Sequence, residues 1–157
     1  MKLFQIEEPD GGPSDRGAPG AAIAIDASGA RAEVAFSVGG NPTVLVDREG
    51  FEQVLQVPSI AAGSQAWQAL FEGARIRAER ALARPVTHAV IVLAARPDAE
   101  VAGGLRQAAR QAGLEALQLA AVAELSADPN AAIAAAILAE DLAPRPEFAM
   151  PPRTDLG

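Results

Sequence analysis

The feature that most constrains the fold is an uninterrupted apolar run at residues 87–95, THAVIVLAA. Apolar side chains at both odd and even positions indicate an interior strand that is covered on both faces. Residues 64–83 before it have apolar side chains at helical spacing, and residues 98–113 after it predict a second helix. A strand that lies between two helices in sequence predicts a sheet built by α/β crossovers.

The helical segments have recognisable start and stop signals. Ser64 is expected to cap the first helix, and Asp98 the second, which ends at Gly113. A further short apolar strand, LEALQLAAV, follows at residues 114–122. The last helix is expected at residues 128–142, with Asp128 as its N-cap and Pro129 in its first turn.

Three β-like segments precede the first helix. They lie at residues 21–27, 30–38 and 42–49, and the spacers SG and GGNP suit tight antiparallel connections. In the second segment apolar residues alternate with Glu33, Ala35 and Ser37, as expected for a strand with one covered face. The whole pattern predicts an α/β fold in the order β-β-β-α-β-α-β-α, a mixed sheet covered by helices, as in ribonuclease H-like and actin-like single lobes.

Length and composition predict one folded domain between two flexible ends. The chain has 157 residues, of which 50% are hydrophobic, so it can bury a core. Residues 1–20 and 144–157 are rich in Gly, Pro and charge, and we expect a flexible leader and a flexible tail there. The folded domain is therefore expected at residues 21–143.

Charge and residue usage exclude several classes of function. A net charge of −7 argues against a nucleic-acid partner, because phosphate binding needs a concentrated basic surface. Zero cysteines and one histidine argue against disulfides and zinc sites. No run of ~18 apolar residues is free of charges or breakers, so we expect no membrane partner and a soluble, cytoplasmic protein.

The order of several motifs resembles the first nucleotide-binding lobe of the DnaK-type heat-shock chaperones, members of the actin-like ATPase superfamily. VIVLAA, LRQAARQAGL, ALQLAAVAE and DPNAAIAAAI match the order of that family's strand ending in V-P-A, its helix of the type RQATKDAGKIAGL, its strand VLRIINEP and its helix opening E-P-T-A-A-A. AIAIDASGARAEVAF is similar to the family's phosphate-binding hairpin, and residues 57–59, VPS, match its P-S segment. The resemblance extends over residues 21–142.

The resemblance implies a degenerate ATP site at the first hairpin. Asp26 takes the position of the aspartate that organises Mg²⁺, and Ser28, Gly29 and Ala30 replace the phosphate-binding Gly-Thr-Thr. One glycine is thereby shifted and two hydroxyls are lost. The alternative is a simple hairpin turn, because Asp, Ser and Gly are common turn residues that bond locally to the backbone.

Other residues of the implied ATPase machinery are replaced or missing. Asp128 takes the position of the E-P-T-A-A glutamate, with an N-cap as the alternative role and Glu124 as an alternative carboxylate. Lys2 is the only lysine, so positive charge for phosphate would come from an arginine such as Arg75 or Arg77. The sequence shows no counterpart of the family's second lobe, which closes the ATP cleft.

Three functions follow from this pattern. The first is a chaperone-related, non-enzymatic interaction or regulatory module that works with a protein partner or as a homodimer. The second is binding of ATP and Mg²⁺ in a cleft that a second copy or a partner chain completes, with weak ATPase activity only if a second lobe is supplied. The third is a truncated product of a chaperone ATPase.

The remaining distinctive residues favour structural roles. His88 stands at the start of the apolar strand without a second histidine or cysteine beside it, which indicates packing. Trp67 and Phe71, one helical turn apart, are expected in the core or at an interface. The Gly103–Gly104 pair is too short for a dinucleotide motif and suggests close contact between helix and sheet.

Overall fold

The order of strands and helices agrees with the sequence pattern. A computed structural model describes residues 20–45, 55–125 and 130–144. Its elements, in chain order, are β1 (Ala21–Ala27), β2 (Glu33–Val38), β3 (Asn41–Leu45), α1 (Ser64–Leu82), β4 (Val86–Leu93), α2 (Ala99–Gln111), β5 (Glu115–Ala121), the short 3-10 helix η1 (Val122–Glu124) and α3 (Ala131–Leu142). Several predicted segments lie outside the described residues. They are the leader except Gly20, the tail except Pro144, the end of the third strand at 46–49, and Asp128 with Pro129.

The five strands form one mixed sheet in the order β3-β2-β1-β4-β5. Short turns join β1 to β2 and β2 to β3, and both pairs are antiparallel. The pairs β1–β4 and β4–β5 are parallel. Helix α2 links β4 directly to β5, whereas the chain passes from β1 through β2, β3 and α1 before it reaches β4. The prediction of a mixed α/β fold with three hairpin-linked strands and two crossovers is confirmed.

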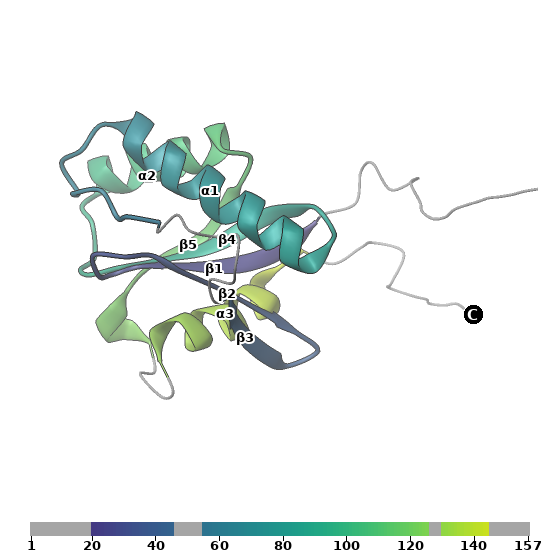
Figure 1. The fold of residues 1–157 in the computed structure, drawn as a ribbon. Coiled ribbons are helices and arrows are strands. Elements are labelled where there is room, and N and C mark those ends of the chain that lie inside the picture. The colour runs from purple at the N-terminus through teal and green to yellow at the C-terminus, as the bar shows by residue number, and fades with distance from the viewer. Residues whose placement is uncertain (1–19, 46–54, 126–129, 145–157) are drawn as a thin grey trace, which may run out of the picture. The chain divides into compact units, whose positions relative to one another are not determined.

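Helices cover both faces of this sheet. Figure 1 shows α1 and α2 on one face and α3 on the other. Successive side chains of β1 point to opposite faces of the sheet, and those on one face are larger than those on the other. Ile23 and Ile25 point toward α1 and α2, whereas Ala22 and Ala24 point toward α3. The face toward α3 is lined by small side chains, and α3 itself buries four alanines completely: Ala132, Ala135, Ala136 and Ala139.

The prediction of one covered face for β2 is wrong. Val34 and Ala35 are neighbours that point to opposite faces, yet both are buried, and Ser37 is only 7% exposed. The reason is that α3 packs on the face that the alternation assigned to solvent. At the end of the strand, Val38, which the alternation assigned to the covered face, is 56% exposed.

Two of the predicted helix starts need correction. α1 begins at Ser64, but its N-cap is Gly63, and no side chain accepts a hydrogen bond there. The N-cap of α3 is Asn130, not Asp128: the Asn130 side chain accepts a hydrogen bond of 2.9 Å from the Ile133 N–H. The Asn130 side chain pairs with an amide at the helix start, as an aspartate would. Asp128 and Asn130 lie two positions apart in the sequence, and both are residue types that cap helices.

The boundaries of α2 are as predicted. Asp98 caps its start by accepting a hydrogen bond of 2.9 Å from the Val101 N–H. Gly113 follows its end with φ of +91°, a conformation that favours glycine. The expected close packing of Gly103 and Gly104 is wrong, since both are exposed and a Cβ atom on either would meet nothing within 4 Å.

None of the helices in the described ranges combines the length and the apolarity needed to cross a membrane.

Candidate functional site

The turn after β1 closes on itself through local hydrogen bonds. Asp26 is the last residue but one of the strand, and its Oδ1 accepts a hydrogen bond of 3.0 Å from the Ser28 N–H. The same oxygen accepts a second one, of 2.6 Å, from the Ser28 hydroxyl. These are the bonds expected of an Asx-type turn. Two of the residues expected to form a phosphate loop are therefore bonded to each other, whereas Gly29 and Ala30 are exposed.

A pocket of about 490 Å³ lies at the carboxyl ends of the two central parallel strands, β1 and β4. We call it the carboxyl-end pocket. Its apolar lining comes from the segment before α1 and from α1, β4 and α2: Val57, Pro58, Ile60, Trp67, Leu93 and Val101. Ser28, Gly29, Arg96 and Asp98 are among the other lining residues. Ligands of open α/β sheets bind at this position, outside the carboxyl ends of the strands.

The rim of the carboxyl-end pocket carries a short network of charges. The Arg96 guanidinium donates a hydrogen bond to Glu124 Oε2, and the Ala121 N–H donates one of 3.0 Å to Glu124 Oε1. The hydrogen bond from the Ala121 N–H is the largest cause of a lowered pKa for Glu124; desolvation opposes it, and Arg96 lowers the pKa further. Glu124 is therefore held ionised by local bonds, as a stabiliser of η1 and of Arg96.

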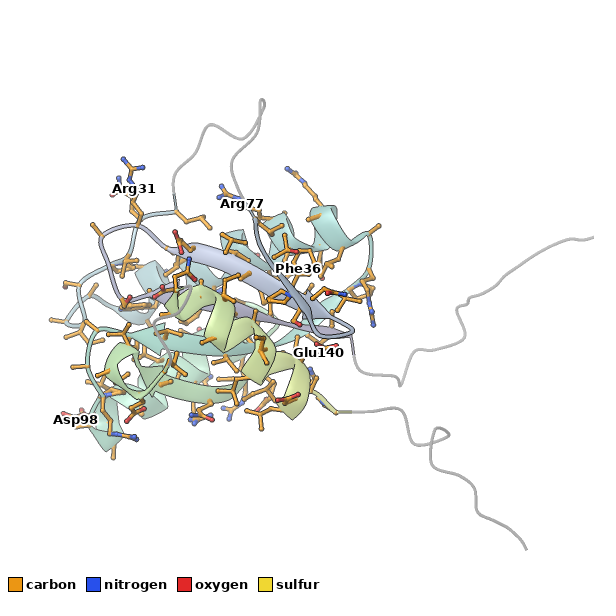
Figure 2. All side chains as sticks on the ribbon, turned by 90° about the horizontal axis from the view of Figure 1, so that it is seen from below. Arg31, Phe36, Arg77, Asp98 and Glu140 are labelled. Carbon is orange, nitrogen blue, oxygen red and sulfur yellow. The ribbon has the colours of Figure 1, made fainter. Side chains whose placement is uncertain are left out.

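A second pocket, of about 450 Å³, lies against the β1–β2–β3 side of the sheet. We call it the hairpin pocket. Its lining includes four charged residues, Asp26, Arg31, Glu33 and Arg77, and Asp26 is directly opposite Glu33 in the strand register. Figure 2 shows Arg31 and Arg77 projecting from the same side of the described domain, whereas Asp98 of the carboxyl-end pocket lies on the other side. Ser28 and Gly29 border both pockets.

α3 points its first turn toward the carboxyl end of β1. Glu140, near the end of α3, is bonded to the β2–β3 turn at Gly39 and Gly40. Because β2 runs antiparallel to β1, this turn lies at the amino end of β1, and the start of α3 lies toward the opposite end. The helix start and Asp26 are thus at the same end of the sheet, while Asp128 itself lies outside the described residues.

The two arginines proposed as replacements for a lysine differ in position. Arg75 donates from Nε to the Ala112 carbonyl oxygen at 2.7 Å and from a terminal nitrogen to Glu79 at 3.0 Å. These bonds tie α1 to the end of α2. Arg77 is half-buried and lines the hairpin pocket with Asp26. Of the two, Arg77 is the one that faces a candidate site.

The aromatic pair of α1 belongs to the core, as predicted. Trp67 is 2% exposed and Phe71 is fully buried, and their ring centroids lie 5.8 Å apart. The indole N–H of Trp67 donates a hydrogen bond of 3.1 Å to the Ser59 carbonyl oxygen. Trp67 consequently joins the core to the wall of the carboxyl-end pocket.

His88 lies at the other end of the sheet, away from both pockets. It is half-buried in β4, and its Nδ1 is 2.7 Å from the Thr87 hydroxyl oxygen. Burial lowers the pKa of His88, and the nearby Glu115 carboxylate partly opposes this effect. The structural role predicted for His88 agrees with this position.

Few side chains in the described part of the chain are placed to bind a metal ion together with Asp26. Among the described residues, no group of three or more His, Asp or Glu side chains is arranged to hold a metal ion. Mg²⁺ commonly binds through one or two carboxylates together with phosphate oxygens and water. The opposed carboxylates of Asp26 and Glu33 fit that pattern for a magnesium ion that arrives with a nucleotide.

Sequence reasoning missed several residues that shape these pockets. Ile60 and Arg96 lie in connecting segments without a motif, and the alternation in the second β-like segment predicts an outward-facing Glu33. A useful signal was available for Arg96, because it follows the carboxyl end of a parallel strand and directly precedes a capped helix, where ligand sites gather.

Comparison with known proteins adds no relative: no protein-family model matches the chain, and neither does any curated protein.

Proposed function

We propose that this chain is a chaperone-related single lobe of the ribonuclease H-like and actin-like type, and that it acts as a non-enzymatic interaction or regulatory module. The sheet order β3-β2-β1-β4-β5, with three hairpin-linked strands followed by two crossovers, supports this fold assignment. The order of the motifs that resemble DnaK-type chaperones supports the relationship. The partner is a protein, or a second copy of the chain, rather than a nucleic acid.

One observation carries the proposal: at the carboxyl-end pocket the polar groups are bonded to one another, while the walls are mainly apolar. Ser28 is bonded to Asp26, and Arg96 to Glu124. A catalytic site needs a base, a nucleophile or a charge that is aimed at the substrate. An apolar hollow with a charged rim instead has the composition of a recognition site.

The test is to determine whether the chain has a partner. Size-exclusion chromatography with light scattering gives the mass in solution, and a pull-down from lysate of the native cell identifies bound proteins. We expect a dimer, or a specific heterologous partner that elutes with the chain as one complex. A strictly monomeric chain that captures no protein above a bead-only control would contradict the proposal.

A second candidate function is the binding of Mg-ATP in a cleft completed by another chain. The hairpin pocket favours it, because its lining includes two carboxylate residues, Asp26 and Glu33, that could serve Mg²⁺ and a basic residue, Arg77, that could serve phosphate. Mg²⁺ would there neutralise phosphate charge, and the chain would position the nucleotide. Binding by half a cleft is expected to be weak.

Calorimetric titration with Mg-ATP tests this candidate. A binding heat that is lost in Asp26→Ala and retained in Asp141→Ala, a variant at an exposed position of α3, would support it. The titration is repeated with the partner from the pull-down, if one is found. Absence of heat in both titrations would end the idea.

A further inference from the structure

We propose that the carboxyl-end pocket receives one large apolar side chain from an extended segment of a partner protein, and that basic residues flank this side chain. The inference rests on the proposed function as an interaction module and names the ligand of that module. Three properties of the pocket support it: its apolar walls, the excess of acidic groups on its rim, and the rigidity of its floor.

The apolar walls are large enough for a bulky side chain. A volume of about 490 Å³ falls within the ~300–1,000 Å³ typical of ligand pockets. Trp67 and Leu93 form buried parts of the lining, whereas Ile60 is 52% exposed although it lies at the pocket. An inserted side chain would remove the exposed surface of Ile60 from water, which is the main source of binding free energy at such hollows.

The rim is acidic. Asp98 lines the pocket, Glu124 is bonded to the lining residue Arg96, and Glu100 lies in the exposed first turn of α2. Asp98, Glu100 and Glu124 carry three negative charges against the one positive charge of Arg96, and the whole chain has a net charge of −7. This arrangement attracts cationic groups and repels acidic ones, so the flanks of the partner segment are basic.

The floor of the pocket is fixed before binding. The indole N–H of Trp67 is bonded to the Ser59 carbonyl oxygen, and the ring packs against Phe71 at an interplanar angle of 41°. The bond also ties the segment that contains Ile60 to α1. A preformed hollow lowers the entropy lost on binding, which favours recognition of a short extended segment.

The chain offers a direct probe, because Trp67 is its only tryptophan. A capped peptide with one large apolar side chain, Lys-Gly-Ala-Phe-Gly-Lys, is titrated into the protein while tryptophan emission is recorded. The matched control peptide has glutamate in place of both lysines. We expect a saturable change in emission with the lysine peptide and roughly tenfold weaker binding of the glutamate peptide at low salt, a difference that shrinks as salt screens the charges.

Two variants locate the site. Ile60→Ser removes the exposed apolar wall and is expected to weaken binding of the lysine peptide about fivefold to tenfold. Ile76→Ser, at a position of α1 that is 39% exposed and outside the pocket, is the matched control and should leave the affinity unchanged. Circular dichroism confirms that both variants are folded.

The outcomes separate this inference from the proposed function. If the peptides bind with equal affinity, or if the emission does not change, the ligand assignment is overturned. If a partner is captured from lysate equally by the wild type and by Ile60→Ser, the interaction module stands and the pocket is not its binding site. Saturable quenching of Trp67 by Mg-ATP at the same site would likewise replace the peptide by a nucleotide.

Discussion

The carboxylate of Glu140 is bonded to the backbone of Gly39: Oε2 accepts a hydrogen bond of 2.7 Å from the Gly39 N–H. Oε1 of the same side chain accepts bonds from the Gly40 N–H, at 3.0 Å, and from the Ser37 hydroxyl, at 2.7 Å. Both glycines have positive φ, which turns their amides toward one point. One side chain of α3 therefore fixes the turn between β2 and β3 (Figure 2).

Replacement of Glu140 by alanine is expected to lower the free energy of unfolding by about 2 kcal/mol, because hydrogen bonds to a charged group are lost at a turn that no other side chain is seen to hold in the described residues. Urea denaturation followed by circular dichroism measures the change. Asp141→Ala is the control, since Asp141 is exposed on the same helix. Equal effects of the two substitutions would show that the contact contributes no stability.

Replacement of Ala83 by glycine is expected to stabilise the protein by about 0.5–1 kcal/mol. Ala83 follows α1 with φ of 56° and ψ of 39°, a left-handed conformation that is costly for a residue with a Cβ atom. The reverse sign is expected for Ala81→Gly, because Ala81 lies within α1 and is exposed. Thermal melts of both variants check the pair; a lower melting temperature for Ala83→Gly would contradict the prediction.

Gly103→Ala is expected to raise the free energy of unfolding by about 0.5–1 kcal/mol. The residue lies inside α2 and is exposed, and the added methyl group meets no atom within 4 Å. Gly73→Ala in α1 gives the comparison, because its Cβ atom would lie only 3.0 Å from a methyl carbon of Leu55. A larger gain for Gly73→Ala than for Gly103→Ala in chemical denaturation would argue against this account.

His88 should make stability depend on pH. Burial lowers its pKa below the value of 6.5 expected in the unfolded chain, so the unfolded state binds the proton more readily. The contribution of His88 to stability is complete above about pH 6.5 and is lost as the pH falls toward the folded-state pKa. Between about pH 8 and about pH 5.5, the wild type should lose more unfolding free energy than His88→Gln. Parallel pH profiles for the two proteins would refute the assignment.

Much of the fold could be predicted, because local patterns and tertiary packing agree in most elements. β1 was placed correctly as a β-like segment followed by a short turn, and α2 from Asp98 and Gly113. β2 was misjudged because alternation within one strand cannot reveal a helix that arrives from the far end of the chain. The cap of α3 was misplaced because Asp128 and Asn130 are chemically similar, and only the backbone conformation selects one.

The candidate site was predicted in part. Asp26, Ser28 and Gly29 do border pockets at the carboxyl end of the sheet. The sequence could not show that the Ser28 hydroxyl is bonded to Asp26, because bond partners depend on side-chain rotamers. It also could not place Ile60, since a segment without periodicity takes its position from the elements around it.

The bond between Glu140 and the β2–β3 turn also bears on how the chain is made. Its two ends lie 101 residues apart, so at ~5–20 residues per second a ribosome adds Glu140 about 5–20 s after Gly39. During this interval the turn lacks the carboxylate to which Ser37, Gly39 and Gly40 donate in the folded protein. The turn between β2 and β3 can therefore take its carboxylate-bonded form only after α3 has been synthesised.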